Sequence, residues 1–401
     1  MKKAGKDAGG RATGPSGATD PAAVAGPLLA WYARARRDLP WRRSRDPYRV
    51  WVSEIMLQQT QVGRVKEFFA RFLDRFPTVT ALAVAAEHDV LRSWEGLGYY
   101  RRARQLHAAA RVVVEEHGGK FPRTAAALRT LPGIGRYTAG AVASIAFDRR
   151  EPIVEANSRR VIARLAGHAG PLDGPHGDEP IWVIAAALVP ARQPGRFNQA
   201  LMDLGSLVCT PERPLCQSCP LAACCVAHAS GRTAEIPAKA ARRKVEEIRE
   251  TAVVVRRDGR VLVVRRRAGE WWEGLWDFPR VDGAARAARR GIARSTLLSG
   301  LDCGATERLG TITHTVTHHK ITLDVVACAA SAAGRPAAGR RWVRAAALTT
   351  LAMTAPGRRI ARMLAAAGSV APDGPVARPP ASFPAFFTRA PCKPVFLGFQ
   401  N

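Results

Sequence analysis

Apolar residues recur at three- and four-residue intervals along the first half of the chain. Residues 62–76 and 103–114 show this spacing, and short breaks that contain Pro or Gly separate such stretches. The spacing is typical of amphipathic helices, because it gathers the apolar side chains on one face of each helix. The pattern therefore predicts a mainly α-helical region, from about residue 28 to residue 228, with no strand.

The pattern changes in the second half of the chain to runs of β-branched residues. Residues 251–255 and 261–264 are such runs, and Asp258-Gly259 between them is a strong signal for a tight hairpin turn. We therefore expect β-strands from residue 251 onward.

Three segments lack the apolar content of a folded domain. Residues 1–26 are rich in Gly, Ala, Pro, Ser and Lys, which predicts a disordered basic tail. Residues 231–249 are polar and read as a linker, and residues 366–401 form a Pro-rich tail. The predicted organisation is two domains, residues 27–230 and residues 250–365, joined by the linker.

The chain is strongly basic. Its 401 residues include 61 Lys and Arg against 33 Asp and Glu, which gives a formal net charge of +28. Such an excess favours a nucleic acid as partner, and a compositional bias toward Arg is the alternative. No apolar run reaches the roughly 18 residues of a membrane helix, and none follows the basic N-terminus as in a secretory signal. We expect a cytoplasmic protein without membrane contact, associated with the nucleoid if it is bacterial.

Five of the eight cysteines are clustered in one segment. Cys209, Cys216, Cys219 and Cys225 have the spacing C-x6-C-x2-C-x5-C, and Cys224 competes with Cys225 as a ligand. Four thiolates on a short segment suit either a [4Fe–4S] cluster or a zinc ion. Zinc sites usually pair two C-x2-C knuckles, and this segment holds one.

A glycine-containing turn precedes a predicted helix in the segment 131–140. Gly133 and Gly135 flank one apolar residue and allow the backbone to turn tightly. The N-terminus of the following helix then offers free N–H groups to a phosphate. An ordinary connection between two helices is the alternative, but the four-cysteine segment that follows favours a helix–hairpin–helix motif that binds DNA.

Residues 28–228 resemble the helix–hairpin–helix DNA glycosylases with an iron–sulfur loop, the endonuclease III superfamily. The segments that carry the resemblance are Leu39-Pro-Trp-Arg42, Trp51-Val-Ser-Glu-Ile-Met-Leu-Gln-Gln-Thr-Gln-Val62, Gly96-Leu-Gly-Tyr-Tyr100, Leu131-Pro-Gly-Ile-Gly-Arg-Tyr-Thr-Ala-Gly140 and Phe197-Asn-Gln-Ala-Leu-Met-Asp-Leu-Gly205. Within this superfamily the chain is most similar to the MutY family of adenine DNA glycosylases. Residues 250–365 resemble the Nudix-like C-terminal domain of that family, which implies an α+β fold for this region.

This resemblance implies a monofunctional DNA glycosylase that acts in base excision repair. The substrate would be adenine mispaired with 8-oxoguanine or guanine in double-stranded DNA, and the enzyme a monomer. The resemblance also implies a [4Fe–4S] cluster on Cys209, Cys216, Cys219 and Cys225. Two alternatives remain, namely a bifunctional glycosylase and lyase for another damaged base, and a catalytically impaired protein that only binds mismatches.

Adenine excision needs an acid for the leaving base and a negative group beside the sugar cation. Glu54 matches the family's acid, which protonates adenine at N7; a Glu on a solvated helix face is the alternative. Glu155 stands where the family has Asp, and its extra methylene displaces the carboxylate. Such a displacement can slow catalysis, which is the basis for the alternative of an impaired enzyme. We expect Glu155 to stabilise the sugar cation and Asn157 to orient the Glu155 carboxylate. Tyr137 stands where lyases carry a nucleophilic Lys, so we expect weak or absent strand cleavage. In the family a Tyr at this position assists the catalytic carboxylates, and packing between the hairpin and the helix is the alternative.

The resemblance also assigns residues that contact DNA. A glycosylase extrudes its target base and fills the gap that the base leaves. The family's wedge is matched by Leu57, Gln58 and Gln59, and its intercalating aromatic ring by Tyr99. The hairpin glycines are matched by Gly133 and Gly135, and the adenine pocket by Trp41, Arg42 and Gln199. For Trp41, Arg42 and Gln199, ordinary packing is the alternative. Arg101, Arg102 and Arg104 suit contacts with phosphate.

The C-terminal domain is expected to recognise the lesion and not to hydrolyse a substrate. A Nudix hydrolase needs a Glu-rich helix that holds Mg²⁺, and residues 280–301 contain no Glu. The family reads 8-oxoguanine with a Phe-Ser-His turn, where this chain has Val316-Thr317-His318. We expect Thr317 and His318 to contact the lesion, and an ordinary strand of β-branched residues is the alternative.

Overall fold

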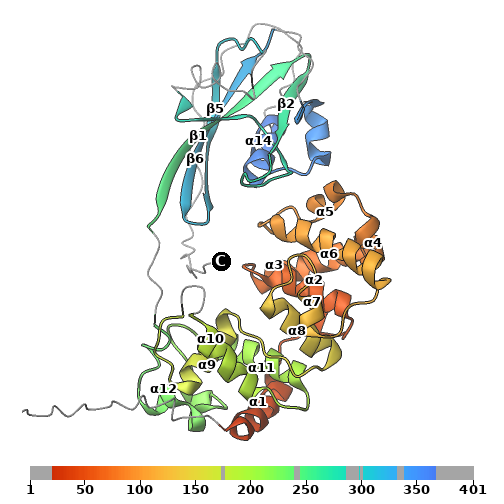
Figure 1. The fold of residues 1–401 in the computed structure, drawn as a ribbon. Helices are drawn as coiled ribbons and strands as arrows, with labels where there is room; N and C mark the ends of the chain where they lie inside the picture. Colours follow the sequence, from red (N-terminus) through yellow and green to blue (C-terminus); the bar gives the residue numbers. More distant parts are fainter. Residues whose placement is uncertain are drawn as a thin grey trace, which may run out of the picture. The chain divides into compact units, whose positions relative to one another are not determined.

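The computed structural model describes residues 20–172, 177–238, 244–285, 298, 301–331 and 338–366. The chain divides into two compact units (Figure 1). One unit comprises Met1–Ile55 and Lys120–Ala241, and the other comprises Met56–Gly119 and Arg242–Asn401.

The first unit is helical, and its described residues contain no strand. Its elements are α1 (Pro21–Ala35), η1 (Pro40–Arg42), nearly all of α2 (Pro47–Leu57), α7 (Ala125–Leu128), α8 (Arg136–Phe147), α9 (Ala156–Ala166), α10 (Glu179–Leu188), α11 (Pro194–Leu207), η2 (Cys216–Ser218), η3 (Ala222–Cys224) and α12 (Val226–Ala229). This arrangement confirms the helical region that the apolar spacing predicts.

Helix α1 begins inside the segment that was expected to be a disordered tail. The Asp20 side chain accepts a hydrogen bond from Ala22 N over 3.0 Å and caps the helix, and Val24 is fully buried. The prediction of a tail as far as residue 26 is therefore wrong at its end. The small residues around Val24 concealed the start of an apolar helix face. Residues 1–19 and 367–401, which make up the rest of the two predicted tails, lie outside the described residues.

Two glycines allow α11 to pack closely against α8 and α9. A Cβ atom on Gly195 would lie 2.4 Å from the Ser144 carbonyl oxygen of α8. A Cβ atom on Gly205 would lie 2.7 Å from both Cβ and the carbonyl oxygen of Asn157 at the start of α9. Real side chains do not tolerate such distances. Gly195 therefore lets α11 approach α8, and Gly205 brings α11 against the N-terminus of α9, where Asn157 and Glu155 lie.

The second unit combines helices with a seven-stranded sheet. Its helices are α3 (Val62–Arg75), α4 (Val79–Val84), α5 (Glu87–Ser93), α6 (Arg101–His117), η5 (Ala345–Thr350) and α14 (Ala355–Ala366). Its strands are β1 (Glu246–Arg257), β2 (Arg260–Arg265), β3 (Trp276–Asp277), β4 (Arg280–Asp282), β5 (Glu307–Val316), β6 (His319–Ala329) and β7 (Arg340–Arg344). The strand order is β3-β2-β1-β6-β5, with β4 paired to β1 and β7 paired to β2.

Strand β1 is the centre of this sheet and is buried on both faces. Ala252 and Val254 join the apolar cluster that includes α14, whereas Val253 and Val255 join the cluster on the opposite face. Burial on both faces explains why this segment reads as an unbroken apolar run. Asp258 and Gly259 have φ values of 46° and 65°, so they form the tight turn to β2 that the sequence predicts.

Strand β1 also begins within the segment that was expected to be a linker. Glu246 pairs in parallel with His319 of β6, and this pairing continues to Arg256. The predicted linker of residues 231–249 is therefore wrong at its C-terminal end. Its last residues are mostly charged and exposed, which hides a strand from a search for apolar runs. Residues 239–243 of this segment lie outside the described residues.

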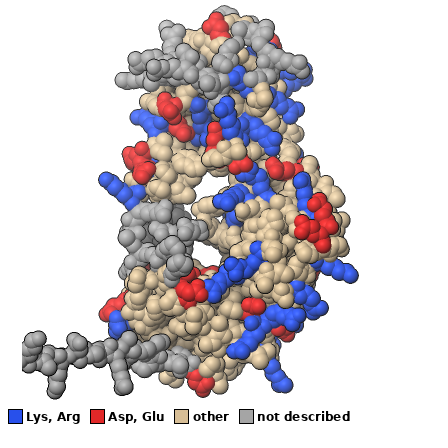
Figure 2. All heavy atoms as spheres, viewed as in Figure 1, with Lys and Arg blue, Asp and Glu red and all other residues tan. Residues whose placement is uncertain are grey.

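The basic character extends to the folded part of the chain. Figure 2 shows Lys and Arg side chains spread over the described surface, with Asp and Glu in smaller groups among them. The net charge of +28 is thus not a property of the tails alone. None of the helices that the structure describes has the length and apolar character needed to span a membrane.

Candidate active site

Glu54 lies on α2 among apolar side chains and is itself only 4% exposed. Trp51 and Met56, its neighbours on the helix, are fully buried. The alternative of a Glu on a solvated face is therefore wrong. The Tyr137 hydroxyl, which α8 supplies, donates a hydrogen bond to Glu54 Oε2 over 2.5 Å. Tyr137 thus contacts the predicted acid directly and does more than pack between two helices.

Burial raises the pKa of Glu54 from its ordinary 4.5 to about 7. The Tyr137 hydrogen bond and the Arg42 charge oppose this increase, whereas the charge of Glu155 adds to it. Burial and the charge of Glu54 also raise the pKa of Tyr137 well above its ordinary value, so Tyr137 remains a hydroxyl donor. A carboxyl group that keeps its proton near neutral pH suits general acid catalysis.

Glu155 caps the N-terminus of α9 with its side chain. Its Oε1 accepts a hydrogen bond from Ser158 N over 2.8 Å, and its Oε2 accepts one from Asn157 N over 2.9 Å. In return, the Ser158 hydroxyl accepts from Glu155 N, which completes a capping box. Burial raises the pKa of Glu155, while these backbone donors oppose the increase. The carboxylate is therefore held at a fixed place by the end of a helix.

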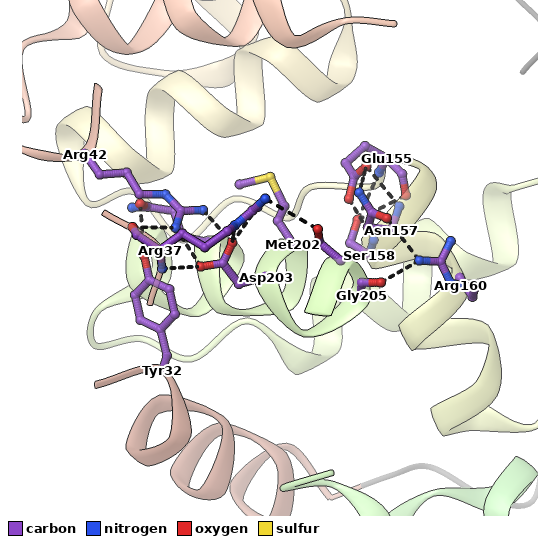
Figure 3. A network of polar contacts seen from close by, with 12 residues as sticks. Tyr32, Arg37, Arg42, Glu155, Asn157, Ser158, Arg160, Met202, Asp203 and Gly205 are labelled. Carbon is purple, nitrogen blue, oxygen red and sulfur yellow. Dashed lines mark hydrogen bonds and ion pairs between the residues drawn. The ribbon is translucent and has the colours of Figure 1, made fainter. Parts of the chain in front are cut away.

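A chain of polar contacts connects Glu155 with the cysteine segment (Figure 3). Asn157 Nδ2 donates to Glu155 Oε2 over 3.2 Å, and Asn157 Oδ1 accepts from Arg160 over 3.0 Å. Arg160 also donates to the carbonyl oxygens of Gly205, over 2.6 Å, and Cys209, over 2.7 Å. Asn157 therefore orients the predicted carboxylate, and Arg160 fixes Asn157. The sequence analysis did not single out Arg160.

A second network in Figure 3 surrounds Asp203, which is fully buried. Arg42 donates to its two carboxylate oxygens over 2.6 and 3.0 Å, and Arg37 Nε donates over 2.7 Å. Tyr32 Oη donates to Gln199 Oε1 over 3.2 Å. These contacts hold Arg42 and Gln199, two residues assigned to the adenine pocket. Asp203 was not among the predicted site residues, although a lone Asp on an apolar helix face signals a buried ion pair.

Four cysteines line one hollow in the first unit. They are Cys209, Cys216, Cys219 and Cys225. Arg164 donates to Cys209 Sγ over 3.3 Å, which suits a thiolate ligand. The Cys224 sulfur lies 3.5 Å from the Leu221 carbonyl oxygen and does not line the hollow. The donor set therefore fits a metal ion or an iron–sulfur cluster and selects Cys225 over Cys224.

Two family models match this chain. The HhH-GPD superfamily base excision DNA repair protein model covers residues 52–174, and the NUDIX domain model covers residues 251–363. The adenine DNA glycosylase of Rattus norvegicus is 36% identical over 375 residues, which cover 79% of this chain and 73% of the relative. The chain belongs to the adenine DNA glycosylase family.

A second curated relative agrees with this assignment. The adenine DNA glycosylase of Mycolicibacterium smegmatis is 44% identical over 240 residues, covering 60% of this chain and 79% of the relative. A solved thermostable thymine-DNA glycosylase is 31% identical with a TM-score of 0.47, covering 53% of this chain and 97% of that chain. As a member of the adenine DNA glycosylase family, the chain is a DNA glycosylase with a helical glycosylase fold and a Nudix-like domain.

The predicted wedge of this adenine DNA glycosylase family member follows the end of α2. Gln59 has a positive φ of 53°, and Tyr99 has one of 47° with half of its surface exposed. Arg102 is buried and donates to the carbonyl oxygens of Met56 and Gly98, over 3.1 and 3.2 Å, while its guanidinium lies 5.6 Å from the Tyr99 ring centre. The expected phosphate contact by Arg102 is therefore wrong, because this side chain connects the end of α2 with the loop that precedes α6.

The helix–hairpin–helix turn and the predicted lesion-reading turn have their expected local forms. Gly133 has a φ of 72°, which favours glycine, and Gly135 caps α8 without a side chain.

Thr317 and His318 form the turn between β5 and β6, so they lie at the end of a hairpin. Thr317 has a φ of 53° and is exposed. A β-branched residue rarely adopts this conformation, which is typical of a strained functional position. The stretch expected to lack a Nudix hydrolase helix lies mostly outside the described residues.

Proposed function

We propose that this chain excises adenine mispaired with 8-oxoguanine or guanine in duplex DNA and leaves an abasic site. The observation that carries the proposal is the contact between the buried Glu54 and the partly buried Tyr137, with a pKa of about 7 for the carboxyl group. The names of the relatives, which are adenine DNA glycosylases, support adenine as the leaving base.

In the proposed reaction, Glu54 donates its proton to the adenine ring. The bond between C1′ and the base nitrogen then breaks, and its electron pair leaves with the neutral base. Glu155 stabilises the positive charge that develops on the sugar. A water oxygen adds to C1′, and the proton that it releases restores the acid. Tyr137 holds the Glu54 carboxyl group in place throughout.

Strand cleavage by β-elimination is not part of the proposal. A lyase forms a Schiff base between a lysine amine and the sugar. Tyr137 occupies the corresponding position and offers a hydroxyl group whose pKa is raised by burial, so it does not supply that amine. The product is therefore an abasic site in an intact strand.

We also propose a [4Fe–4S] cluster on Cys209, Cys216, Cys219 and Cys225, since these side chains line one hollow. When bound, the cluster would hold the loop that carries Cys209, and Arg160 reaches that residue from α9. Thr317 and His318 are proposed to contact 8-oxoguanine opposite the adenine. The proposed setting is the cytoplasm, with the chain acting as a monomer.

Base release from four duplexes tests this function. The duplexes carry adenine opposite 8-oxoguanine, guanine, cytosine or thymine, and free adenine is measured by chromatography under single-turnover conditions. We expect release opposite 8-oxoguanine and guanine, and strand breaks only after hot alkali. Breaks without alkali would indicate a lyase, and binding without release would indicate a protein that only recognises mismatches.

A further inference from the structure

We propose that Glu246, His318 and His319 bind one divalent transition-metal ion of the zinc class at the end of the β5–β6 hairpin. Glu246 begins β1, and the two histidines lie at the turn and at the start of the neighbouring β6 (Figure 1). Two imidazoles and one carboxylate form a donor set that zinc accepts in proteins, with a water as the fourth ligand.

The distances between the three side chains fit such a site. One ligand atom from each residue lies within 4.8 Å of the others. His319 Nε2 lies 3.2 Å from Glu246 Oε2, and His318 Nε2 lies 3.8 Å from Glu246 Oε1. In a tetrahedral zinc site with bonds of about 2.0–2.1 Å, neighbouring ligand atoms lie roughly 3.3 Å apart. Small rotations of the side chains therefore suffice to place an ion among them.

Thr317 orients both imidazoles for this role. Its hydroxyl oxygen lies 3.4 Å from His318 Nδ1 and 3.3 Å from His319 Nδ1, and the hydroxyl donates to the Val316 carbonyl oxygen over 2.7 Å. Because the hydroxyl proton is used on Val316, its oxygen can accept from both Nδ1–H groups, in the tautomer that metal binding through Nε2 requires. This leaves both Nε2 atoms as acceptors that face Glu246. Metal-binding histidines usually have such an oxygen partner on their other nitrogen.

The surroundings restrict the two rings further. The Trp271 ring centre lies 5.0 Å from that of His319, and the rings of His318 and His319 are 4.0 Å apart. This packing holds both rings beside the Glu246 carboxylate. A metal ion can therefore bind both rings and the carboxylate at the same time.

Zinc binding to the full-length chain tests this inference, with a chromophoric chelator as the competitor. Glu246→Gln and His319→Gln are compared with the wild type and with His117→Gln, which changes a histidine at the end of α6. All four proteins keep the eight cysteines, so zinc bound by thiols contributes equally. We expect the first two variants to lose one zinc equivalent or at least tenfold in affinity, with no change in His117→Gln.

Equal zinc stoichiometry and affinity in all four proteins would overturn the site. Thr317→Ala tests the orienting role separately, because it removes the oxygen partner but leaves all three ligands. We expect about a 10- to 100-fold lower zinc affinity in this variant, with recovery in Thr317→Ser. An unchanged affinity in Thr317→Ala would overturn the role of the hydroxyl group. Circular dichroism of each variant checks that the domain is folded.

Discussion

The Tyr137 hydroxyl donates to Glu54 Oε2 over 2.5 Å, between two side chains that the sequence separates by 83 positions. The contact joins the predicted acid on α2 with the residue that follows the hairpin turn on α8. Burial raises the pKa of Glu54, and the hydrogen bond from Tyr137 keeps that pKa at about 7 by opposing the effect of burial. The pair therefore sets the pH range in which the acid carries its proton.

The first prediction concerns the pH dependence of adenine release. The acid must be protonated, so the single-turnover rate constant should be highest below pH 7 and should fall as the pH rises through about 7. Tyr137→Phe removes a contact that lowers the pKa of Glu54. The midpoint of the fall should therefore move to higher pH, even though the maximal rate decreases. A midpoint that is the same in both proteins would contradict the assignment of Glu54 as the titrating acid.

The second prediction concerns stability. The folded chain binds the Glu54 proton more tightly than the unfolded chain, because the pKa is about 7 in the folded state against 4.5 in the unfolded state. The contribution of this group to the free energy of unfolding therefore decreases as the pH rises from 4.5 to about 7. Glu54→Gln removes the titration and keeps an oxygen for Tyr137. The melting temperature of the variant should therefore increase relative to that of the wild type as the pH rises from about 5 to 8. Differential scanning calorimetry at several pH values measures this difference, and a constant difference would contradict the prediction.

The third prediction concerns the buried ion pairs of Asp203. Its side chain is fully buried between Arg37 and Arg42, so Asp203→Asn leaves arginine charges without their partner. We expect a loss of about 3 kcal/mol in the free energy of unfolding. Asp38→Asn is the matched control, since Asp38 pairs with Arg43 at the surface, with 74% of its side chain exposed. Denaturant unfolding should show a change of less than about 1 kcal/mol for this control.

The fold was largely predictable from the sequence, because helical spacing and β-branched runs report burial directly. The boundaries were less accessible. Val24 lies among small residues, and Glu246 begins a strand whose first residues are charged, so neither segment carries a strong apolar signal. Both elements form because other parts of the chain cover or pair with them.

The site was predictable as a set of residue types but not as a network. The resemblance assigned Glu54, Tyr137 and Glu155, and the structure adds the contact between the first two and the helix cap formed by the third. A lone Asp on a helix face marks Asp203 as a paired residue. The distant partners of Asp203 and Arg160 could not be found from local patterns, since they lie in other segments of the chain. The choice of Cys225 over Cys224 likewise required the positions of the side chains around the hollow.

The fourth prediction uses this difference between neighbouring cysteines. Cys225→Ser and Cys216→Ser each remove a sulfur that lines the hollow, and both should lose most of the bound iron and the associated visible absorbance. Cys224→Ser should keep both, because the sulfur of Cys224 lies outside the hollow. Iron and sulfide analysis of the purified proteins measures the result. Loss of iron in Cys224→Ser but not in Cys225→Ser would reverse the assignment.

The fifth prediction addresses the departure of Glu155 from the Asp expected by resemblance to the family. The Glu155 carboxylate accepts hydrogen bonds from Ser158 N, Asn157 N and Asn157 Nδ2, so its position is fixed despite the longer side chain. We expect the wild-type chain to be an active enzyme. Glu155→Asp should retain activity because Asp is also a good helix cap. Glu155→Gln removes the negative charge and should lower the rate by at least about 100-fold.

The most direct test is single-turnover release of adenine opposite 8-oxoguanine by the wild type, Glu155→Asp and Glu155→Gln, with strand breaks read after hot alkali. Duplex binding by each protein is measured in parallel, so that loss of catalysis is separated from loss of affinity. We expect adenine release by the wild type and by Glu155→Asp, and no release by Glu155→Gln. Tight binding without release by the wild type, together with release by Glu155→Asp, would contradict this expectation.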